Sequence, residues 1–430
     1  MNQNVVYLHG QPSPVAHFLR VGTSGHRQLE TLLSSGQMPM DRLVFEASAV
    51  GRQRDLFAAL TEGGAELILD TNIAELSSVG RFEGAAKTAP WANPDAIITS
   101  EDLTRSANRD ILGQIARFAV EMGFSAVQAP VRFIQDSKDE KFSTDLKSAT
   151  ALRDALDREG GKAIGLDYSL MIPYASLRDP VHRRAFIQSL ASIPFENLWF
   201  RVSGFGADAS PAGVRRYIAA MLDFHRLGRP IVADGVGGLV GVAAAAFGAA
   251  GGICHGVAEK ERFSAADWHK PPKGGGGGRE KRVLVEGLDR LLSLKQMEAL
   301  MAAPNARRHL SCGDPRCCPR GLDDTLKNPK AHYLRQRHGQ LVELSGVPES
   351  RRIQHFIDKQ LAPIEKRARQ ASKLKVKDEA LAKMLLTNGE RLEKMHVVLD
   401  ALNQALSGDA RSAPPVRRTG KARTSSVRKG

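Results

Sequence analysis

The chain has 430 residues, 42% of them hydrophobic, which is enough for a sizeable core and too many for one small domain. Its net charge of +14 points to a polyanionic partner, with nucleic acid ahead of an anionic membrane surface. No apolar run of membrane-spanning length and no signal-peptide pattern occurs, so we expect a cytoplasmic protein without a membrane partner.

Short apolar runs alternate with helical patterns along the first part of the chain. Strands are expected at residues 5–8, 42–46, 66–70, 125–129, 162–167, 197–202, 230–233 and 251–254. Helices are expected at residues 26–35, 53–61, 108–122, 143–159, 180–193 and 211–225, and in the Ala-rich stretch after Gly235–Gly238. Eight such units predict a (β/α)8 barrel over residues 1–263, with a doubly wound open sheet as the alternative.

Polar residues after the expected strands are the candidate functional groups, because barrel enzymes place their sites at the carboxyl ends of the strands. These residues are His9, Glu46, Asp70, Asn72, Gln128, Arg132, Asp167, Tyr168, Arg201, Ser203, Asp234, Cys254 and His255. Any one of them can instead be a loop polar group or a helix cap. Gathered in one concave mouth, the carboxylates of Asp70, Asp167 and Asp234 can raise each other's pKa and act as acid, base or nucleophile.

The segment 264–282 predicts a flexible loop, since it contains five consecutive glycines, Gly274 to Gly278. It lacks the Gly-Lys-Ser/Thr ending of a phosphate-binding loop. A disordered connector is favoured over a basic flap that touches phosphates.

A cysteine cluster follows within residues 283–340. Cys312, Cys317 and Cys318 lie in a loop rich in Gly and Pro, which in an intracellular chain suggests a metal rather than a disulfide. Three thiolates and one further ligand can hold a tetrahedral structural zinc ion, and reduced surface thiols are the alternative. The available fourth ligands are His309, His332, His338 and His355.

The last part of the chain is expected to be helical and then disordered. Apolar residues recur at helical spacing within residues 341–408, namely Leu361, Ile364, Ala368, Leu381, Met384 and Leu385. This pattern predicts a helical hairpin or coiled coil, which can form a dimer surface. Residues 409–430 carry many basic side chains and predict a disordered tail.

This order of parts resembles the tRNA-guanine transglycosylase superfamily, which includes relatives that act on DNA. The similar stretches are Leu67–Thr71, Arg229–Gly248, the cysteine cluster and Ala331–Arg335. The resemblance implies a cytoplasmic glycosyltransferase that exchanges a guanine-type base, such as a 7-deazaguanine, with His355 as the preferred fourth ligand of a structural zinc. The family's nucleophilic aspartate would fall near Ile253 or Cys254, where this chain has no carboxylate.

Base exchange needs a carboxylate at the anomeric carbon of the sugar and an acid for the leaving base. We assign Asp70 as acid or base, Asp234 as nucleophile and Asp167 to the edge of the base. Ser203, Gly204 and Gly235 complete the expected substrate site. The expected partners are tRNA or DNA, with a second copy of the chain or an operon-encoded protein. The alternatives are a barrel enzyme for a small phosphorylated or flavin ligand at Gly235–Gly238, or a non-catalytic nucleic-acid-binding relative.

Overall fold

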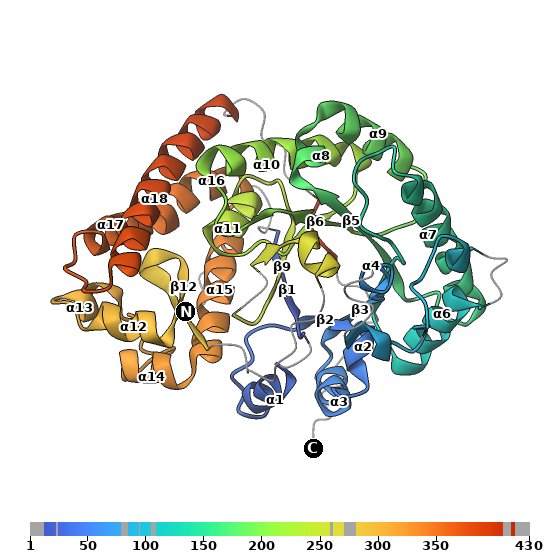
Figure 1. The fold of residues 1–430 in the computed structure, drawn as a ribbon, viewed down its shortest axis with the longest axis horizontal. Coiled ribbons are helices and arrows are strands. Elements are labelled where there is room, and N and C mark those ends of the chain that lie inside the picture. The colour runs from blue at the N-terminus through green and yellow to red at the C-terminus, as the bar shows by residue number, and fades with distance from the viewer. Residues whose placement is uncertain are drawn as a thin grey trace, which may run out of the picture.

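The computed structural model describes residues 13–22, 25–78, 85–93, 95–104, 109–258, 261–270, 281–406 and 414–417. Within this part of the chain, a parallel barrel lies inside a ring of helices (Figure 1). Its strands are β1 (Ala16–Arg20), β2 (Arg42–Glu46), β3 (Glu66–Asp70), β4 (Ala126–Gln128), β5 (Gly165–Pro173), β6 (Leu198–Ser203), β8 (Ile231–Asp234) and β9 (Gly252–Gly256).

The strand pairing closes the sheet on itself. Hydrogen-bonded neighbours follow the order β5-β4-β3-β2-β1-β9-β8-β6, and β5 also pairs with β6. Because these eight strands are all parallel, the pairing confirms the (β/α)8 barrel and excludes the open sheet. Two short strands, β7 (Phe205–Gly206) and β10 (Arg262–Phe263), add a small extension beyond the end of β6.

Helices connect the barrel strands. They are α1 (His26–Ser34), α2 (Ala47–Val50), α3 (Arg54–Glu62), α4 (Ile73–Leu76), α6 (Ile111–Met122), α7 (Glu140–Arg158), α8 (Tyr174–Arg178), α9 (Pro180–Leu190), α10 (Pro211–Asp223) and α11 (Gly238–Ala246). Four of the long helices begin at a side chain that accepts a hydrogen bond from a free N–H group of the first turn. These caps are Asp110, Asp139, Asp179 and Ser210, and they fix where α6, α7, α9 and α10 begin.

The chain after the barrel packs onto it. The hairpin of β11 (Arg282–Val285) and β12 (Arg290–Ser293) is followed by α12 (Leu294–Met301), α13 (Ala306–Leu310), α14 (Leu322–Lys327), α15 (Pro329–Ser345), α16 (Arg352–His355), α17 (Ala362–Ala371) and α18 (Glu379–Leu406). Helices α17 and α18 pack side by side as the expected hairpin (Figure 1). The expected boundary at residue 340 falls inside α15, which packs against β1 and α11. One buried hydrophobic cluster runs from the barrel into α18, so the extension shares the barrel's core.

One expectation about the strands lies outside the described residues, and two about a strand and a loop differ from the structure. The strand expected at residues 5–8 lies outside the described residues, as does His9, and the first barrel strand is β1. Strand β5 continues to Pro173, six residues past its expected end. Within the expected flexible loop, residues 265–269 form a short helical turn, while Gly274–Gly278 lie outside the described residues.

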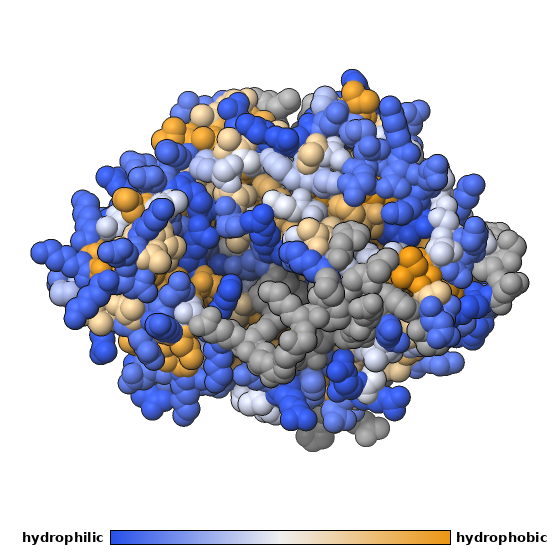
Figure 2. All heavy atoms as spheres, in the orientation of Figure 1, coloured by the Kyte–Doolittle hydropathy of each residue, from blue (hydrophilic) through white to orange (hydrophobic). Residues whose placement is uncertain are grey.

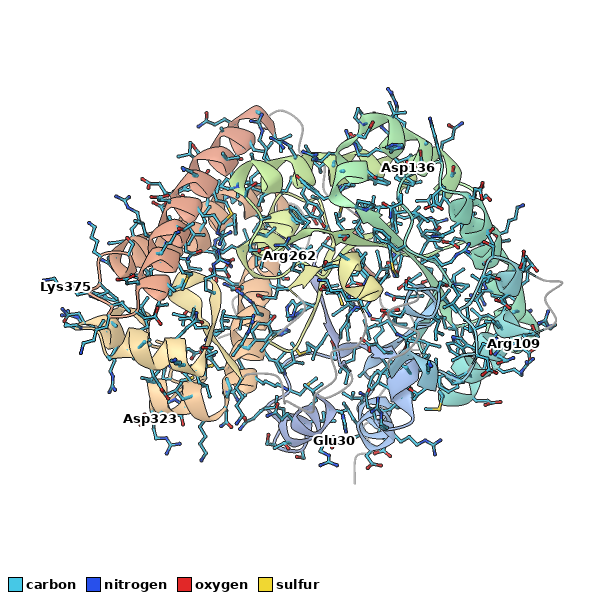
Figure 3. The ribbon with its side chains drawn as sticks, viewed as in Figure 1. Glu30, Arg109, Asp136, Arg262, Asp323 and Lys375 are labelled. Atoms are coloured by element: carbon cyan, nitrogen blue, oxygen red, sulfur yellow. The ribbon has the colours of Figure 1, made fainter. Side chains whose placement is uncertain are left out.

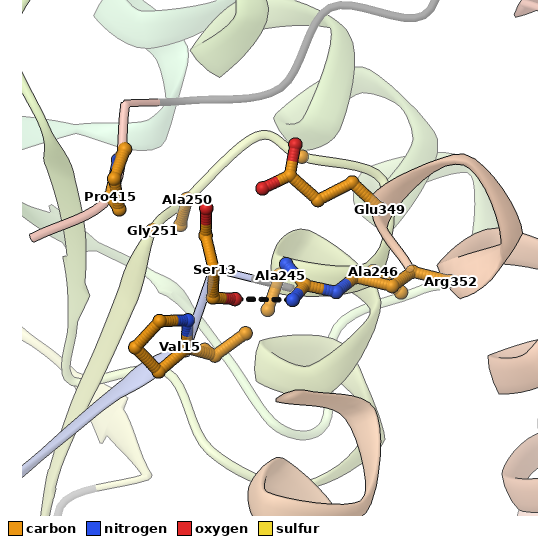
Figure 4. A pocket seen from close by; sticks show the side chains of 11 residues that line it. Ser13, Val15, Ala245, Ala246, Ala250, Gly251, Glu349, Arg352 and Pro415 are labelled. Carbon is orange, nitrogen blue, oxygen red and sulfur yellow. Dashed lines mark hydrogen bonds between the residues drawn. The ribbon is translucent and has the colours of Figure 1, made fainter. Parts of the chain in front are cut away.

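The C-terminal segment 414–417 closes the amino-terminal end of the barrel. Val416 is 4% exposed and joins the interior cluster that contains Phe18, Trp199 and Cys254. A Cβ atom added at Gly251 would lie 2.8 Å from the Pro414 carbonyl oxygen, which explains why glycine stands there. Figure 4 shows this corner, with Pro415 beside Gly251. Disorder throughout the tail was therefore a wrong expectation for residues 414–417, because Val416 gains burial inside the barrel.

The described helices include none that is long and apolar enough to cross a membrane. The face of the molecule in Figure 2 is mainly hydrophilic, with hydrophobic residues in small groups.

Replacing Val416 by alanine tests whether the tail segment stabilises the barrel. We expect Val416→Ala to lower the free energy of unfolding by roughly 1 to 2 kcal/mol, because a buried branched side chain is lost and a cavity remains. The matched control is Val397→Ala on α18, where the side chain is 66% exposed and little should change. Denaturant-induced unfolding measures both variants, and equal stability of Val416→Ala and the wild type would contradict the docking.

Candidate functional site

The carboxyl ends of β1, β3 and β8 bring three charged side chains together inside the barrel. Arg20 donates from Nη1 to Asp70 Oδ2 at 2.5 Å, from Nε to Asp234 Oδ1 at 3.0 Å and from Nη2 to Asp234 Oδ2 at 2.6 Å. All three residues are buried. The structure therefore unites Asp70 and Asp234, the expected catalytic pair, through an arginine that the sequence interpretation missed.

A second arginine balances the charge of this cluster. Arg201 of β6 places Nε 3.4 Å from Asp234 Oδ2 and Nη1 3.6 Å from Asp70 Oδ2. Burial by itself raises the pKa of both carboxyl groups, but the charges of Arg20 and Arg201 outweigh it, so the pKa of Asp70 and of Asp234 is lowered. Both groups are ionised near neutral pH. They can act as base, nucleophile or charge partner, and the lowered pKa of Asp70 does not favour its expected role as an acid.

Aromatic side chains cover this mouth. The guanidinium carbon of Arg201 lies 5.1 Å from the ring centroid of Phe263 and 5.8 Å from that of Trp268. Both rings belong to the segment that follows β9 and crosses the end of the barrel. Arg262 lies in this segment and is labelled near the centre of Figure 3. The covering segment shields the charged cluster from water and so strengthens its electrostatic interactions.

Three buried polar atoms on β4, β5 and α4 have no hydrogen-bond partner among the described residues. They are Nε2 of Gln128, Oγ of Ser169 and Oε2 of Glu75. The other amide atom of Gln128, Oε1, accepts from Arg20 Nη2 at 3.3 Å. Buried polar groups are normally paired, so these atoms are positions at which a ligand or water can bind.

Asp167 lies deeper in the barrel than expected. It is the third residue of β5, and its carboxylate accepts from Asn197 Nδ2 and from Trp199 Nε1, each at 2.8 Å. Burial raises its pKa to about 7, against the lowering effect of these two hydrogen bonds. The expected role at the edge of a base is therefore corrected, because the carboxylate serves the barrel interior and not its mouth.

Two of the other expected substrate-binding residues bond to the covering segment, and the third bonds to β9. Ser203 Oγ accepts from the backbone N–H of Ala265 at 2.9 Å, and the N–H of Gly204 donates to the Phe263 carbonyl at 3.0 Å. The N–H of Gly235 donates to the Cys254 carbonyl at 2.9 Å. These contacts engage the Ser203 hydroxyl oxygen and the N–H groups of Gly204 and Gly235 within the protein, so these atoms have a structural role beside the mouth.

The remaining candidates also have structural partners. Arg132 donates from Nε to Asp145 Oδ1 at 2.8 Å and so fixes the loop after β4. Asn72 accepts from the backbone N–H of Ser48 at 3.0 Å. Cys254 is buried beneath Asp234, and burial followed by that negative charge raises the pKa of its thiol, which makes it a poor nucleophile.

A second buried polar network lies between β9 and α15. The Tyr333 hydroxyl donates to Glu261 Oε1 at 2.9 Å and lies 3.0 Å from His255 Nδ1, while Arg337 Nε donates to the same Glu261 oxygen at 2.8 Å. His255 Nε2 in turn lies 2.9 Å from His17 Nε2. Sequence reasoning singled out His255 alone, because its direct partners Tyr333 and His17 lie far away in the chain.

The cysteine cluster converges with one histidine. Ligand atoms of Cys312, Cys317, Cys318 and His332 all lie within 4.8 Å of one another, a group that could hold a metal ion. His332 Nε2 lies 2.9 Å from the Leu284 carbonyl oxygen, which leaves Nδ1 facing the sulfur atoms of Cys317 and Cys318.

The preference for His355 as the fourth ligand is corrected by this arrangement. His355 lies on α16 and its Nε2 is 2.8 Å from Glu343 Oε1, outside the cysteine group. His338, another alternative, lies against His17 with their Nδ1 atoms 3.3 Å apart. His309 is likewise not a member of the group.

Comparison with known proteins gives a fold likeness only. No protein-family model matches the chain, and no curated protein matches it. An endo-1,4-beta-xylanase from Penicillium canescens aligns with a TM-score of 0.38 and 11% identity over 56% of this chain and 81% of that one. A type I 3-dehydroquinate dehydratase from Clostridium difficile aligns with a TM-score of 0.35 and 9% identity over 60% and 90%. Likeness at this level adds nothing to the strand pairing, which establishes the barrel.

Removing the guanidinium of Arg20 tests the charged cluster. We expect Arg20→Met to lower the free energy of unfolding by about 3 to 5 kcal/mol at pH 7, because Asp70 and Asp234 lose their main buried partner. In the wild type, the lowered pKa of both carboxyl groups stabilises the fold above their unfolded pKa of about 4, and this stabilisation is lost as the pH falls through the folded values. The difference between the two proteins should therefore shrink as the pH falls below about 4.

The control is Arg117→Met, because Arg117 forms half-exposed ion pairs with Asp110 and Glu159. Unfolding of this variant should differ from the wild type by less than about 1 kcal/mol. Equal losses in the two variants, or a loss in Arg20→Met that does not change with pH, would contradict the account.

Proposed function

We propose that this chain is a barrel glycosyltransferase that exchanges a guanine-type base, such as a 7-deazaguanine, in tRNA or DNA. The observation that carries the proposal is the pair of buried, ionised carboxylates of Asp70 and Asp234, held together by Arg20 at the barrel mouth. Breaking a bond between a sugar and a base develops positive charge on the anomeric carbon. A carboxylate placed there can stabilise that charge or capture the carbon covalently.

The groups in and around the carboxylate pair have different proposed roles. Asp234 serves as the nucleophile, and Asp70 lies across Arg20 as the second negative charge. Phe263 and Trp268 supply aromatic faces at the mouth, on which a base drawn out of its stack can lie. The excess of basic side chains, +14 over the chain, favours a phosphate backbone as the binding partner outside the mouth.

The cysteine group supports the transglycosylase-like order of parts. Three thiolates and one imidazole form a donor set of structural zinc, and the hydrogen-bonded Nε2 of His332 fits a ligand that binds through Nδ1. We infer that Cys312, Cys317, Cys318 and His332 hold zinc. The ion would fix the loop of residues 312–318 against α15, as a structural and not a catalytic element.

A small phosphorylated ligand at Gly235–Gly238 is less well supported. Asp289 Oδ2 accepts from the backbone N–H of Leu239 at 3.0 Å, so a carboxylate already caps α11. A Cβ atom at Gly237 would lie 2.5 Å from Glu261 Oε1, which shows that a second carboxyl group fills the adjoining space. Two negative side chains therefore occupy the helix N-terminus at which a phosphate would bind, and their charge would repel it.

Metal analysis tests the zinc site and discriminates between the two histidines. We expect elemental analysis of the purified protein to give about one zinc per chain, and Cys318→Ser and His332→Gln to lose it, because a tetrahedral structural site needs all four ligands. His355→Gln is the matched control and should keep its zinc, since His355 pairs with Glu343. Zinc retained in His332→Gln but lost in His355→Gln would reverse the assignment, and a zinc-free wild type would remove it.

Incorporation of labelled guanine into tRNA and into DNA tests the base exchange. We expect Asp234→Asn and Asp70→Asn to lower kcat by at least about 100-fold, because each removes a charge that the transition state needs. Asp95→Asn changes an exposed carboxylate in the same way and should leave the rate unchanged. Full exchange in both mouth variants would place the chemistry elsewhere. Nucleic-acid binding without any exchange by the wild type would favour a non-catalytic relative.

A further inference from the structure

Glu75 is a largely buried residue whose carboxyl group the roles assigned so far leave unused. It lies on α4, which begins three residues after β3 ends, and so its side chain reaches the same mouth as Asp70. Its Oε1 atom lies 4.0 Å from Arg201 Nη2, and its side chain is 13% exposed. Its Oε2 atom is buried and has no hydrogen-bond partner among the described residues. A buried acceptor without a partner can be satisfied by a proton on the carboxyl group or by a donor atom of a ligand.

The charges around Glu75 favour its neutral form. Glu46, Asp70 and Arg201 face it from the ends of β2, β3 and β6. Arg201 is shared, because its guanidinium lies closer to Asp234 and Asp70, at 3.4 and 3.6 Å, than to Glu75. Two arginines therefore balance two aspartates, and a third carboxylate has no cation of its own. Burial raises the pKa of Glu75, the charge of Asp70 raises it further, and Arg201 only partly opposes this.

We propose that Glu75 is the catalytic residue that gives a proton to the leaving base and recovers one from the incoming base, an inference that rests on the base exchange proposed above. The mouth then contains carboxyl groups of two kinds. Asp70 and Asp234 are ionised because arginines hold them, whereas Glu75 only shares Arg201, at 4.0 Å, and holds its proton more firmly. Catalysis by an acid and a nucleophile requires two neighbouring carboxyl groups with different pKa values, and different surroundings produce that difference.

The proposed step balances as follows. The bond between the anomeric carbon and the base nitrogen breaks, its electron pair goes to the base, and the Glu75 proton moves to that base. The Asp234 carboxylate bonds to the anomeric carbon as an ester. The incoming base then attacks this carbon, the ester bond breaks to restore the Asp234 carboxylate, and the proton lost by the incoming nitrogen returns to Glu75. No oxidant, reductant or further reactant is needed.

Infrared difference spectroscopy tests the protonation of Glu75 without any substrate. We expect the carboxylic acid C=O band of the wild type at pH 7 to lose intensity in Glu75→Gln. Other carboxyl groups that carry a proton for part of the time at pH 7, such as Asp167 with its pKa of about 7, are present in both proteins and cancel. Glu62→Gln is the matched control, because Glu62 is exposed at the end of α3 and the same change there should leave the band unchanged. An unchanged band in Glu75→Gln overturns the proposal.

Base exchange by the same variants tests the catalytic role. We expect Glu75→Gln to lower kcat about 100-fold or more with little change in KM, because an amide cannot donate and recover the proton. Glu62→Gln should match the wild type. Wild-type kcat in Glu75→Gln overturns the role of Glu75 while leaving the base exchange intact. If the wild type exchanges no base but shows the acid band, the base exchange fails, and the band still supports Glu75 as a proton-carrying group of the mouth.

Discussion

The contact of one buried arginine with two aspartates organises this structure. Arg20 is separated by 50 residues from Asp70 and by 214 from Asp234, yet all three meet inside the barrel. A buried ion pair is costly to desolvate and contributes little net stability, although removing one partner costs much more. The contribution of Arg20 is to position the two aspartates. Arg20 holds two carboxylates ionised and close together in a place shielded from water, where their charge acts most strongly.

The barrel is closed at both ends by chain that follows its last strand. Phe263 and Trp268 cover the carboxyl end, and Val416 fills the amino end. Helix α15 links the cysteine group to the barrel, since His332 faces the sulfur atoms while the next residue, Tyr333, contacts His255 and Glu261. A metal held by the cysteine group would therefore restrain the helix that packs against β1, and metal loading and barrel stability would be coupled.

Most of the barrel could be predicted from the sequence, because the strands at residues 42–46, 66–70 and 197–202 each contain three consecutive apolar residues. The first strand was missed because His17 and Arg20 interrupt its apolar pattern, and their partners lie far along the chain. The approach of Asp70 to Asp234 was predictable from the strand ends. The ionised state of Asp70 and Asp234 depends on Arg20, which is distant in the chain. The position of His332 as the fourth member of the cysteine group depends on how α15 packs. Local sequence therefore could not predict either feature.

The central claim is that the mouth carboxylates carry the chemistry, with Asp234 bonding to the sugar. The most direct measurement is peptide mapping by mass spectrometry of protein that has been quenched with acid while it turns over tRNA or DNA. The account predicts a sugar adduct on the peptide that contains Asp234, absent from Asp234→Asn. An adduct on a peptide from outside the barrel mouth, or turnover by Asp234→Asn at the wild-type rate, would contradict it.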